Sequence, residues 1–470
     1  MRSFAGIKLT ARGNQSMSSA VGYPITEAGL RWLEGILSER YGCSCRLSQE
    51  NEGIYLRLLG SCKSILFDNQ AESFIQSNSS VPYTTWEAHR EGWESFISGS
   101  VPAPGISKLP CPLIEIADDK ARFHYDVLGL TYWMLNRIEE IGRTDLDEHS
   151  RFPACSSHAF KHGYLNRPVV DEWLFILAGV MRLIWPGASF YNHAFKIRLS
   201  HDVDRPSRYA LCSRLGFLRS AIGDFSRNRR IGDIAQAVSI RARSEVILDP
   251  RDPFNTFKWM MDEADRRGIS SSFFFLCGTT DRAKDGDYDI EHPAMLTLIR
   301  GIAERGHEIG VHPSYGSCTQ ASIIKSESDR LWSILEREQI HQNQFGGRMH
   351  YLRWKHPETL HALAASILTY DNTLGYADHP GFRCGTCFEY TAFDPVTSNI
   401  LPLRLIPLIV MDQTFLSKKY NKNFATDELD EMAELKQTCK KAGGVFSLLW
   451  HNNHLVDPRH RRFFSEIIEL

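Results

Sequence analysis

The second half of the chain alternates short apolar runs with amphipathic stretches, and this alternation constrains the fold more than any other feature. From residue 196 onward, runs rich in β-branched and aromatic residues are separated by segments with helical spacing of apolar residues. Parallel strands need long crossover connections, so the alternation predicts a parallel α/β sheet with right-handed crossovers. An open doubly wound sheet and a closed β/α barrel both satisfy the pattern.

Seven strands and five helices are expected in this half. The strands are predicted at residues 196–200, 271–277, 307–311, 345–351, 367–372, 402–410 and 444–450. The helices are predicted between them, at residues 256–267, 292–305, 319–340, 356–366 and 425–441. No GxGxxG motif follows a strand and no GxxxxGK[ST] motif occurs, which argues against a nucleotide-binding sheet.

Residues 22–190 are expected to form a smaller α+β accessory domain. Helical spacing covers residues 26–40, 124–141 and 168–185, and residues 54–59 are strand-like. The pattern breaks at WPGASFYNHAF, residues 185–195. We therefore place the second domain at residues 191–470 and a disordered tail at residues 1–21.

The composition is that of an ordinary globular protein: of the 470 residues, 43 % are hydrophobic and 23 % are charged. A net charge of −2 gives no indication of nucleic acid or an anionic membrane as a partner. No apolar run approaches the roughly 20 residues of a membrane span and no secretory signal is recognised, so a cytoplasmic location is expected. Eleven cysteines without regular spacing indicate reduced thiols.

Polar side chains gather where the predicted strands end. In parallel α/β folds these ends share one edge of the sheet, and functional sites lie there. Five strands carry such residues at or near their ends: His201, Asp202 and Asp204; His312, Ser314 and Tyr315; Arg348, His350 and Tyr351; Asp371, Asp378, His379 and Arg383; and His451, Asn452 and Asn453. This pattern indicates a metal or acid–base site.

Aspartate and histidine at these positions suit hydrolysis assisted by a divalent cation. Both residue types are ligands of Zn²⁺ and similar ions. Asp202 and Asp204 stand at i and i+2, so on an extended strand they point to the same side. One can hold a metal while the other takes a proton from water, whose pKa a bound ion lowers from 15.7 to about 7. A nearby arginine can keep that base ionised, and a histidine can protonate a leaving group.

Four motifs in this order resemble those of the polysaccharide deacetylases of carbohydrate esterase family four. They are LSHDVD at residues 199–204, GHEIGVH at 306–312, GGRMHY at 346–351 and SLLWH at 447–451. The resemblance extends over residues 196–455 and implies a distorted seven-stranded β/α barrel. It also implies removal of an acetyl group from an N-acetylated sugar with a divalent metal as cofactor, zinc being the expected ion.

Carried over residue by residue, the resemblance implies distinct roles for five side chains. Asp202 is the general base and Arg348 its partner. His451 is the general acid, and Asp204 and His312 bind the metal. The segment 147–173 resembles an uncharacterised domain that precedes the deacetylase region in some bacterial members.

One position departs from the family pattern. A second histidine usually follows the first by four residues, but Gly316 stands there and has no side chain that can bind a metal. His350, where the family commonly has proline, is the favoured replacement. His201, His379 or a site that holds no metal in the usual way are the alternatives. His201 points to the opposite side of the strand from Asp202, so we expect it to support the site.

Further residues are expected to contact substrate or to support the site. Tyr315, Arg383, Trp450 and Asn452 are predicted to bind substrate, although Arg383 could instead pin a loop. In the N-terminal part, five basic side chains either line a substrate groove or belong to a solvated loop packed on the second domain, and the loop interpretation is favoured: His149, Arg151, His158, Lys161 and His162.

The sequence therefore predicts a metal-dependent hydrolase of C–N bonds, a sugar N-deacetylase serving bacterial surface-polysaccharide assembly. Its expected partner is an acetylated sugar or glycan, and neither nucleic acid nor a membrane span is expected. An O-acetyl esterase is an alternative with the same chemistry. A non-catalytic glycan-binding protein on the same scaffold is the rival from another class.

Overall fold

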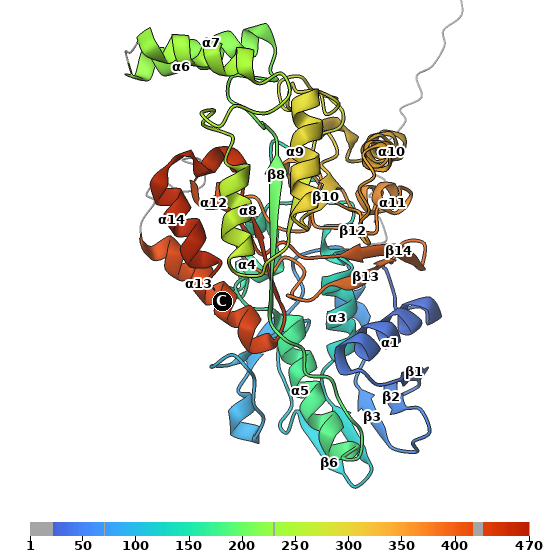
Figure 1. Cartoon of the computed structure of the whole chain (residues 1–470). Helices are drawn as coiled ribbons and strands as arrows, with labels where there is room; N and C mark the ends of the chain where they lie inside the picture. Colours follow the sequence, from blue (N-terminus) through green and yellow to red (C-terminus); the bar gives the residue numbers. More distant parts are fainter. Residues whose placement is uncertain (1–21, 70, 229–230, 417–425, 470) are drawn as a thin grey trace, which may run out of the picture.

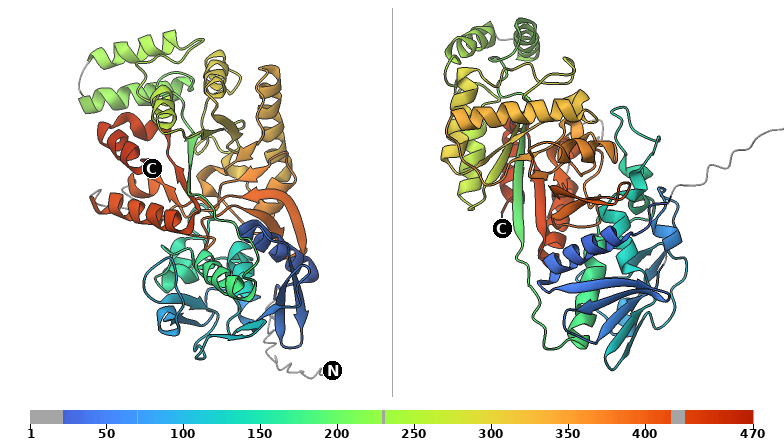
Figure 2. Two further views of the ribbon diagram at one scale, coloured as in Figure 1. Left: turned by 60° about the horizontal axis from the view of Figure 1, so that its bottom comes forward. Right: turned by 90° about the vertical axis from the view of Figure 1, so that its right-hand side faces the viewer.

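The computed structural model describes residues 22–69, 71–228, 231–416 and 426–469 (Figure 1). The N-terminal part forms a five-stranded and a two-stranded β-sheet with its helices, and the chain from residue 196 forms a larger sheet (Figures 1 and 2). Within these ranges, no helix is both long and apolar enough to cross a membrane. The expected tail, residues 1–21, lies outside the described residues.

The N-terminal sheet has five strands in the order β1-β2-β3-β7-β6. They are β1 (Cys45–Glu50), β2 (Gly53–Leu58), β3 (Ser64–Phe67), β6 (Ile114–Ala117) and β7 (Lys120–Phe123), while β4 (Tyr83–Trp86) pairs separately with β5 (Val101–Pro104). The helices are α1 (Glu27–Tyr41), α2 (Ala71–Phe74), α3 (Val127–Leu135), α4 (His158–Lys161) and α5 (Val169–Ile184). The three longest match the three predicted helices, and every residue of α3 is buried, as in a core helix.

The larger sheet has nine strands in the order β13-β14-β12-β11-β10-β9-β8-β16-β15. They are β8 (Lys196–Val203), β9 (Ser271–Phe275), β10 (Glu308–Val311), β11 (Gly346–Gly347), β12 (Tyr370–Asp371), β13 (Tyr390–Asp394), β14 (Asn399–Leu405), β15 (Val410–Met411) and β16 (Val445–Leu449). All neighbouring pairs are parallel except β13 with β14. The expected parallel α/β fold is confirmed, and each of the seven predicted ranges contains a strand.

The strand count differs from the expected seven for two reasons. β13 is an additional antiparallel strand, and the predicted strand 402–410 is divided into β14 and β15. The paired strands of the described chain form a sheet with two ends, not a closed barrel. The segment between β14 and β15 nevertheless bonds to both sides, because Ile406 N donates to Asp371 O and Ile409 N donates to Ser447 O. The sheet therefore curls along this segment.

Helices and short turns connect the strands. Five helices match the predicted ranges: α8 (Phe257–Asp265), α9 (Pro293–Glu304), α10 (Ala321–Arg337), α11 (Glu358–Ala364) and α13 (Thr426–Ala442). The sequence did not indicate α6 (Arg214–Asn228), α7 (Ile231–Arg243), α12 (Asp412–Leu416) or α14 (Pro458–Ile467). The 3₁₀ turns are η1 (Ala88–Glu91), η2 (Ile138–Glu140), η3 (Ala154–Ser156), η4 (Tyr315–Ser317), η5 (His350–Leu352) and η6 (Asn452–Val456). The hairpin of α6 and α7 projects from the top of the molecule in Figure 1.

A buried cluster of charges joins the two parts of the chain. Arg383 donates from Nε and Nη2 to the two carboxylate oxygens of Glu140, at 2.9 and 2.6 Å, and Arg137 Nε donates to Glu140 at 2.9 Å. All three side chains are buried. Burial alone would raise the pKa of Glu140, but the two arginines outweigh it and lower the pKa to about 2. Arg383 therefore pins the loop after β12 to the N-terminal part, which is the second of its two expected roles.

Replacing Glu140 by alanine should lower the free energy of unfolding by about 3–5 kcal/mol, because two buried guanidinium groups would lose their shared carboxylate. Urea unfolding followed by tryptophan fluorescence measures this loss. Glu94→Ala, at an exposed position, is the control and should change the free energy by less than about 0.5 kcal/mol. Equal losses in the two variants would contradict a stabilising role for the cluster.

Candidate metal and acid–base site

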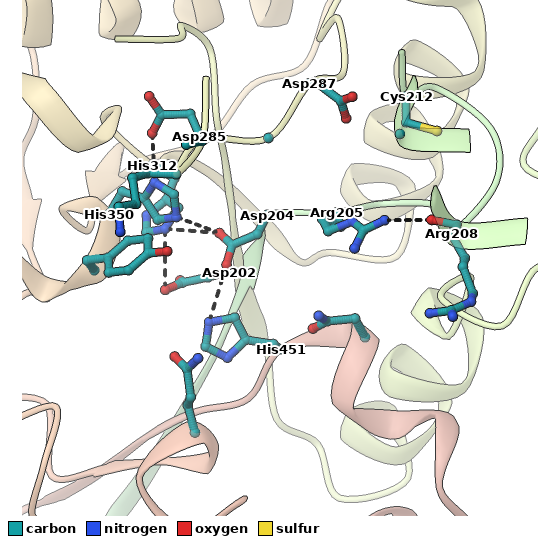
Figure 3. A pocket seen from close by; sticks show the side chains of 18 of the residues that line it. Asp202, Asp204, Arg205, Arg208, Cys212, Asp285, Asp287, His312, His350 and His451 are labelled. Atoms are coloured by element: carbon teal, nitrogen blue, oxygen red, sulfur yellow. Dashed lines mark hydrogen bonds and ion pairs between the residues drawn. The ribbon is translucent and has the colours of Figure 1, made fainter. Parts of the chain in front are cut away.

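Six of the predicted site residues meet at the carboxyl ends of neighbouring strands. Parallel pairing places Val203 of β8, Phe275 of β9 and Val311 of β10 side by side. The site residues stand at or just beyond these ends: Asp202 and Asp204 at β8, His312 after β10, Arg348 and His350 after β11, and His451 after β16. Figure 3 shows the labelled side chains of this group directed toward one another.

The site opens into a cavity of about 530 Å³. Such a volume is within the roughly 300–1,000 Å³ usual for small-molecule sites. Asp202, Asp204, His312, His350 and His451 all line it. Across Asp204 from His312 and His350, the lining includes Arg205 and Arg208 (Figure 3). The cavity therefore has a histidine-rich side and an arginine-rich side.

Asp204, His312 and His350 form a three-residue group whose ligand atoms lie within 4.8 Å of one another. Nε2 of His312 is 3.3 Å from Oδ1 of Asp204, and Nε2 of His350 is 3.5 Å from the same oxygen. This Oδ1 is buried and makes no hydrogen bond within the described chain. One carboxylate oxygen and two imidazole nitrogens converging in this way suit a divalent cation such as zinc.

Both imidazoles are held by their other ring nitrogen. Nδ1 of His312 donates to the carbonyl oxygen of Arg348 at 2.5 Å, and Nδ1 of His350 donates to Oδ1 of Asp285 at 2.8 Å. A donor at Nδ1 leaves Nε2 with its lone pair free in the neutral ring. Metal-binding histidines are usually oriented by such outer partners, so this arrangement supports the metal assignment.

The charges of the group reinforce one another. Burial opposes ionisation of Asp204, but His350, His312 and His451 outweigh it and hold the pKa of that carboxyl well below its usual range. Burial would likewise lower the pKa of His312, but Asp202 and Asp204 raise it overall. Asp204 is therefore a carboxylate at neutral pH, as a metal ligand must be.

The alternatives for the third ligand lie elsewhere. His201 is buried on the other side of β8, where Nδ1 donates to Trp450 O at 2.8 Å and burial lowers its pKa to about 3. The side chain of His379 is 42 % exposed and packs on Phe160. Gly316 contributes only backbone here, and its N–H donates to Thr280 Oγ1 at 2.6 Å. Among these candidates, His350 is the residue that faces Asp204 and His312.

Asp202 and Arg348 form a buried pair beside the metal group. Nη1 of Arg348 donates to Oδ1 of Asp202 at 2.7 Å. The other oxygen, Oδ2, lies 3.7 Å from Nε2 of His312 and thus faces the candidate metal position. This geometry leaves one oxygen of Asp202 available to accept a proton.

His451 approaches the group from another side. Its Nδ1 donates to Oδ1 of Asp412 at 2.7 Å, and its Nε2 lies 3.7 Å from Oδ2 of Asp204. Burial alone would lower the pKa of His451, but Asp412, Asp204 and Asp202 raise it to about 10. His454 also bonds to Asp412, through Nδ1 at 2.7 Å, and is partly buried. Asp412, His451 and His454 form a second group with metal-ligand spacing, but Asp412 already satisfies both histidines by hydrogen bonds.

The predicted substrate-binding residues do not line the cavity. The hydroxyl group of Tyr315 is hydrogen-bonded to Nδ1 of His149, 3.1 Å away. Trp450 is fully buried against Phe464. Asn452 Nδ2 donates to the backbone oxygens of Arg205 and Phe254, so it fixes loops around the site. Some of the polar residues that follow a strand therefore line the cavity, whereas others hold the surrounding loops in place.

The N-terminal part reaches the site. The favoured interpretation, a solvated loop packed on the second domain, did not predict this contact. Arg151 lines the cavity, and its Nη1 donates to the carbonyl oxygen of Tyr351 at 2.8 Å. Tyr351 and Leu352, which follow His350, both adopt left-handed backbone angles, with φ of 63° and 53°. Such angles are costly for these residue types and need support from their surroundings.

Two acids of the site escaped the sequence analysis. Asp412 stands directly after β15, so the rule of reading the residue beyond each strand would have found it had strand 402–410 been given its observed end. Asp285 lies in the long connection after β9, ten residues past the strand, where no periodic signal places it. Both serve as hydrogen-bond partners of the predicted histidines.

Comparisons with known proteins match parts of the chain. DUF7033, a family of unknown function, matches residues 32–186. Among solved structures, a protein described as a polysaccharide deacetylase from Mycobacterium smegmatis has a TM-score of 0.38 and 17 % identity, over 59 % of this chain and 84 % of that chain. The Puue allantoinase has a TM-score of 0.36 and 12 % identity, over 60 % and 85 %. No curated protein matches the sequence.

We expect His350→Ala to lose bound metal, because one of the three protein ligands disappears. Asp285→Asn should weaken metal affinity by about 10–100-fold, because the imidazole of His350 loses the carboxylate that orients it. Metal content by mass spectrometry after dialysis, followed by zinc titration, measures both effects. Asp287→Asn, a cavity-lining acid that bonds only to the backbone of Ser213 in the described chain, is the control. Equal zinc in wild type and His350→Ala would refute the assignment.

Proposed function

We propose that this protein is a metal-dependent hydrolase that removes the acetyl group from an N-acetylated sugar. The observation that carries the proposal is the joint placement of three units at one cavity. These units are the group Asp204, His312 and His350, the pair of Asp202 with Arg348, and the pair of His451 with Asp412. The four sequence motifs that resemble polysaccharide deacetylases supply the substrate class.

Asp204, His312 and His350 would hold the metal, and zinc is the ion that this donor set favours. When bound, the ion would lower the pKa of a water and polarise the acetamide carbonyl. Asp202 accepts the proton of the attacking water through Oδ2, since Oδ1 is engaged by Arg348. As the C–O bond forms and the C–N bond breaks, His451 donates a proton to the departing nitrogen. The products are acetate and a free amine.

The protonation of His451 favours an amide over an ester as substrate. An amine leaves only after it gains a proton, whereas an alkoxide is a better leaving group by itself. The contact with Asp412 raises the pKa of His451, so a proton is present at neutral pH. A binding protein would gain nothing from burying a charged base and a charged acid around one cavity. Both features support a deacetylase over the rival functions.

Asp202→Asn should lower turnover by about 10²–10⁴-fold while the sugar still binds, because an amide cannot accept the proton of water. Acetate release from a panel of N-acetylated and O-acetylated sugars, together with calorimetric binding, separates the two effects. Glu94→Gln, at an exposed position outside the cavity, is the control. Wild-type protein that binds these sugars but releases no acetate would identify a glycan-binding protein and overturn the proposal.

Asp412→Asn should move the alkaline limb of the kcat/KM profile to lower pH. The carboxylate of Asp412 raises the pKa of His451, so its loss lowers that pKa and the acid is deprotonated earlier as the pH rises. His451→Gln should abolish the limb and lower kcat by about 10²–10⁴-fold. An unchanged limb in Asp412→Asn would show that another group is the acid.

A further inference from the structure

The hairpin of α6 and α7 exposes an unusual amount of apolar surface. Of the 18 large hydrophobic side chains that are exposed in the described chain, six belong to α6 or α7 and two more lie shortly after α7: Leu215, Leu218, Ile222, Phe225, Ile234 and Val238, then Val246 and Ile247. The four in α6 stand at i, i+3, i+7 and i+10, so they form one stripe along the helix. We call these four side chains the α6 stripe. Contiguous exposed apolar surface of this kind usually marks a binding surface.

The α6 stripe is not the face by which the hairpin packs. The two helices hold each other through a small separate core of Tyr209, Ala221, Ala237 and Ile240, with Phe217 beside it. Within the stripe, Leu215 is 68 % exposed and Ile222 is 60 % exposed. In Figures 1 and 2 the hairpin extends beyond the sheet and its other helices. The stripe is therefore free to meet something outside the described chain.

The hairpin segment is also strongly basic. Residues 205–243 contain nine arginines, two aspartates and no lysine or glutamate, a net charge of +7 in a chain whose net charge is −2. Arg208 pairs with Asp224. Arg205, Arg214 and Arg219 form no ion pair with any described residue. The rest of the chain is net negative and offsets the positive charge of this segment. For that reason the net charge of the whole chain gave no indication of an anionic partner.

One side of α6 faces the candidate active site. Gly216, Arg219, Ser220 and Gly223 line the cavity, together with Arg205 from the connection before the helix. Arg219 itself lines the cavity, forms no ion pair with a described residue, and directly follows Leu218 of the α6 stripe. Whatever covers the stripe therefore lies next to the cavity.

We propose that the α6–α7 hairpin is a docking surface for an anionic lipid membrane. Amphipathic helices with bulky apolar side chains on one face and arginines beside it lie in the headgroup region of such membranes. Anionic headgroups match the excess of positive charge. A second copy of the hairpin would place like charges next to one another. Nucleic acid would match the positive charge but has no apolar surface to bury the α6 stripe. Docking in this way places the cavity beside the headgroups, so a substrate could enter from the membrane surface.

The test is co-sedimentation of the full chain with vesicles of phosphatidylcholine, with and without phosphatidylglycerol. Wild type should bind the anionic vesicles, bind the neutral ones more weakly, and be released by salt. The double variant Leu218→Gln/Ile222→Gln should lower the partition coefficient by about tenfold or more, since two bulky side chains no longer enter the lipid. Arg214→Gln and Arg219→Gln should each lower it by about fivefold on anionic vesicles.

The matched control is Leu59→Gln/Leu183→Gln, two leucines that are 62 % and 61 % exposed elsewhere in the molecule. This control should bind as wild type does, and circular dichroism should show that all variants are folded. Three outcomes would overturn the proposal: wild type that stays in the supernatant, binding that the α6 variant retains, or a dimer broken by that variant without any vesicle binding. None of these readouts depends on catalysis, so failure here and failure of the proposed deacetylase activity are distinguishable.

Discussion

The buried guanidinium of Arg348 is the contact on which the site depends. Its side chain is completely buried, and groups from two strands bind it: Asp202 and Ser200 of β8, and the backbone and side-chain oxygens of Asn372 after β12. A buried cation requires such partners, because an unpaired one would cost several kcal/mol. Asp202 is therefore part of the folding energetics and of the proposed chemistry at once. The carbonyl of Arg348 additionally holds His312, so the same residue orients the proposed base and a proposed metal ligand.

The replacement of the missing histidine changes how the metal group is built. In the resembled family both histidines follow one strand, whereas here Gly316 leaves that position empty and His350 comes from the end of β11. The group then uses β8, β10 and β11, and its geometry depends on the short pairing of Val311 with Gly347. Asp285 compensates by fixing the ring of His350 from the connection after β9. A ligand taken from a less constrained segment is thus held by an additional carboxylate.

Much of this arrangement could be predicted because strand periodicity and parallel pairing are encoded locally. Once the strand ends are known, Asp202, Asp204, His312 and His451 must share one edge of the sheet. Partners from connections carry no comparable signal, and Asp285 was missed for this reason. Arg383 had two expected roles, and the sequence could not decide between them because its buried partner Glu140 lies 243 positions earlier in the chain. The helix α6 was missed although Leu215, Leu218, Ile222 and Phe225 have helical spacing, so the sequence did carry a signal that could have found it.

The N-terminal part contributes to the site through the backbone that follows His350. Tyr351 and Leu352 both occupy the left-handed region, which costs about 1–3 kcal/mol for each such residue. Arg151 donates to the carbonyl of Tyr351, and Arg353 donates to the carbonyl of His149, so two hydrogen bonds from opposite directions hold this turn. Because this turn directly follows His350, it fixes the direction of the imidazole ring. We therefore expect a chain that lacks residues 147–151 to relax this turn and to shift the ring of His350, the proposed third metal ligand. The N-terminal part therefore contributes directly to the position of His350, through the hydrogen bonds of Arg151 and His149 with this turn.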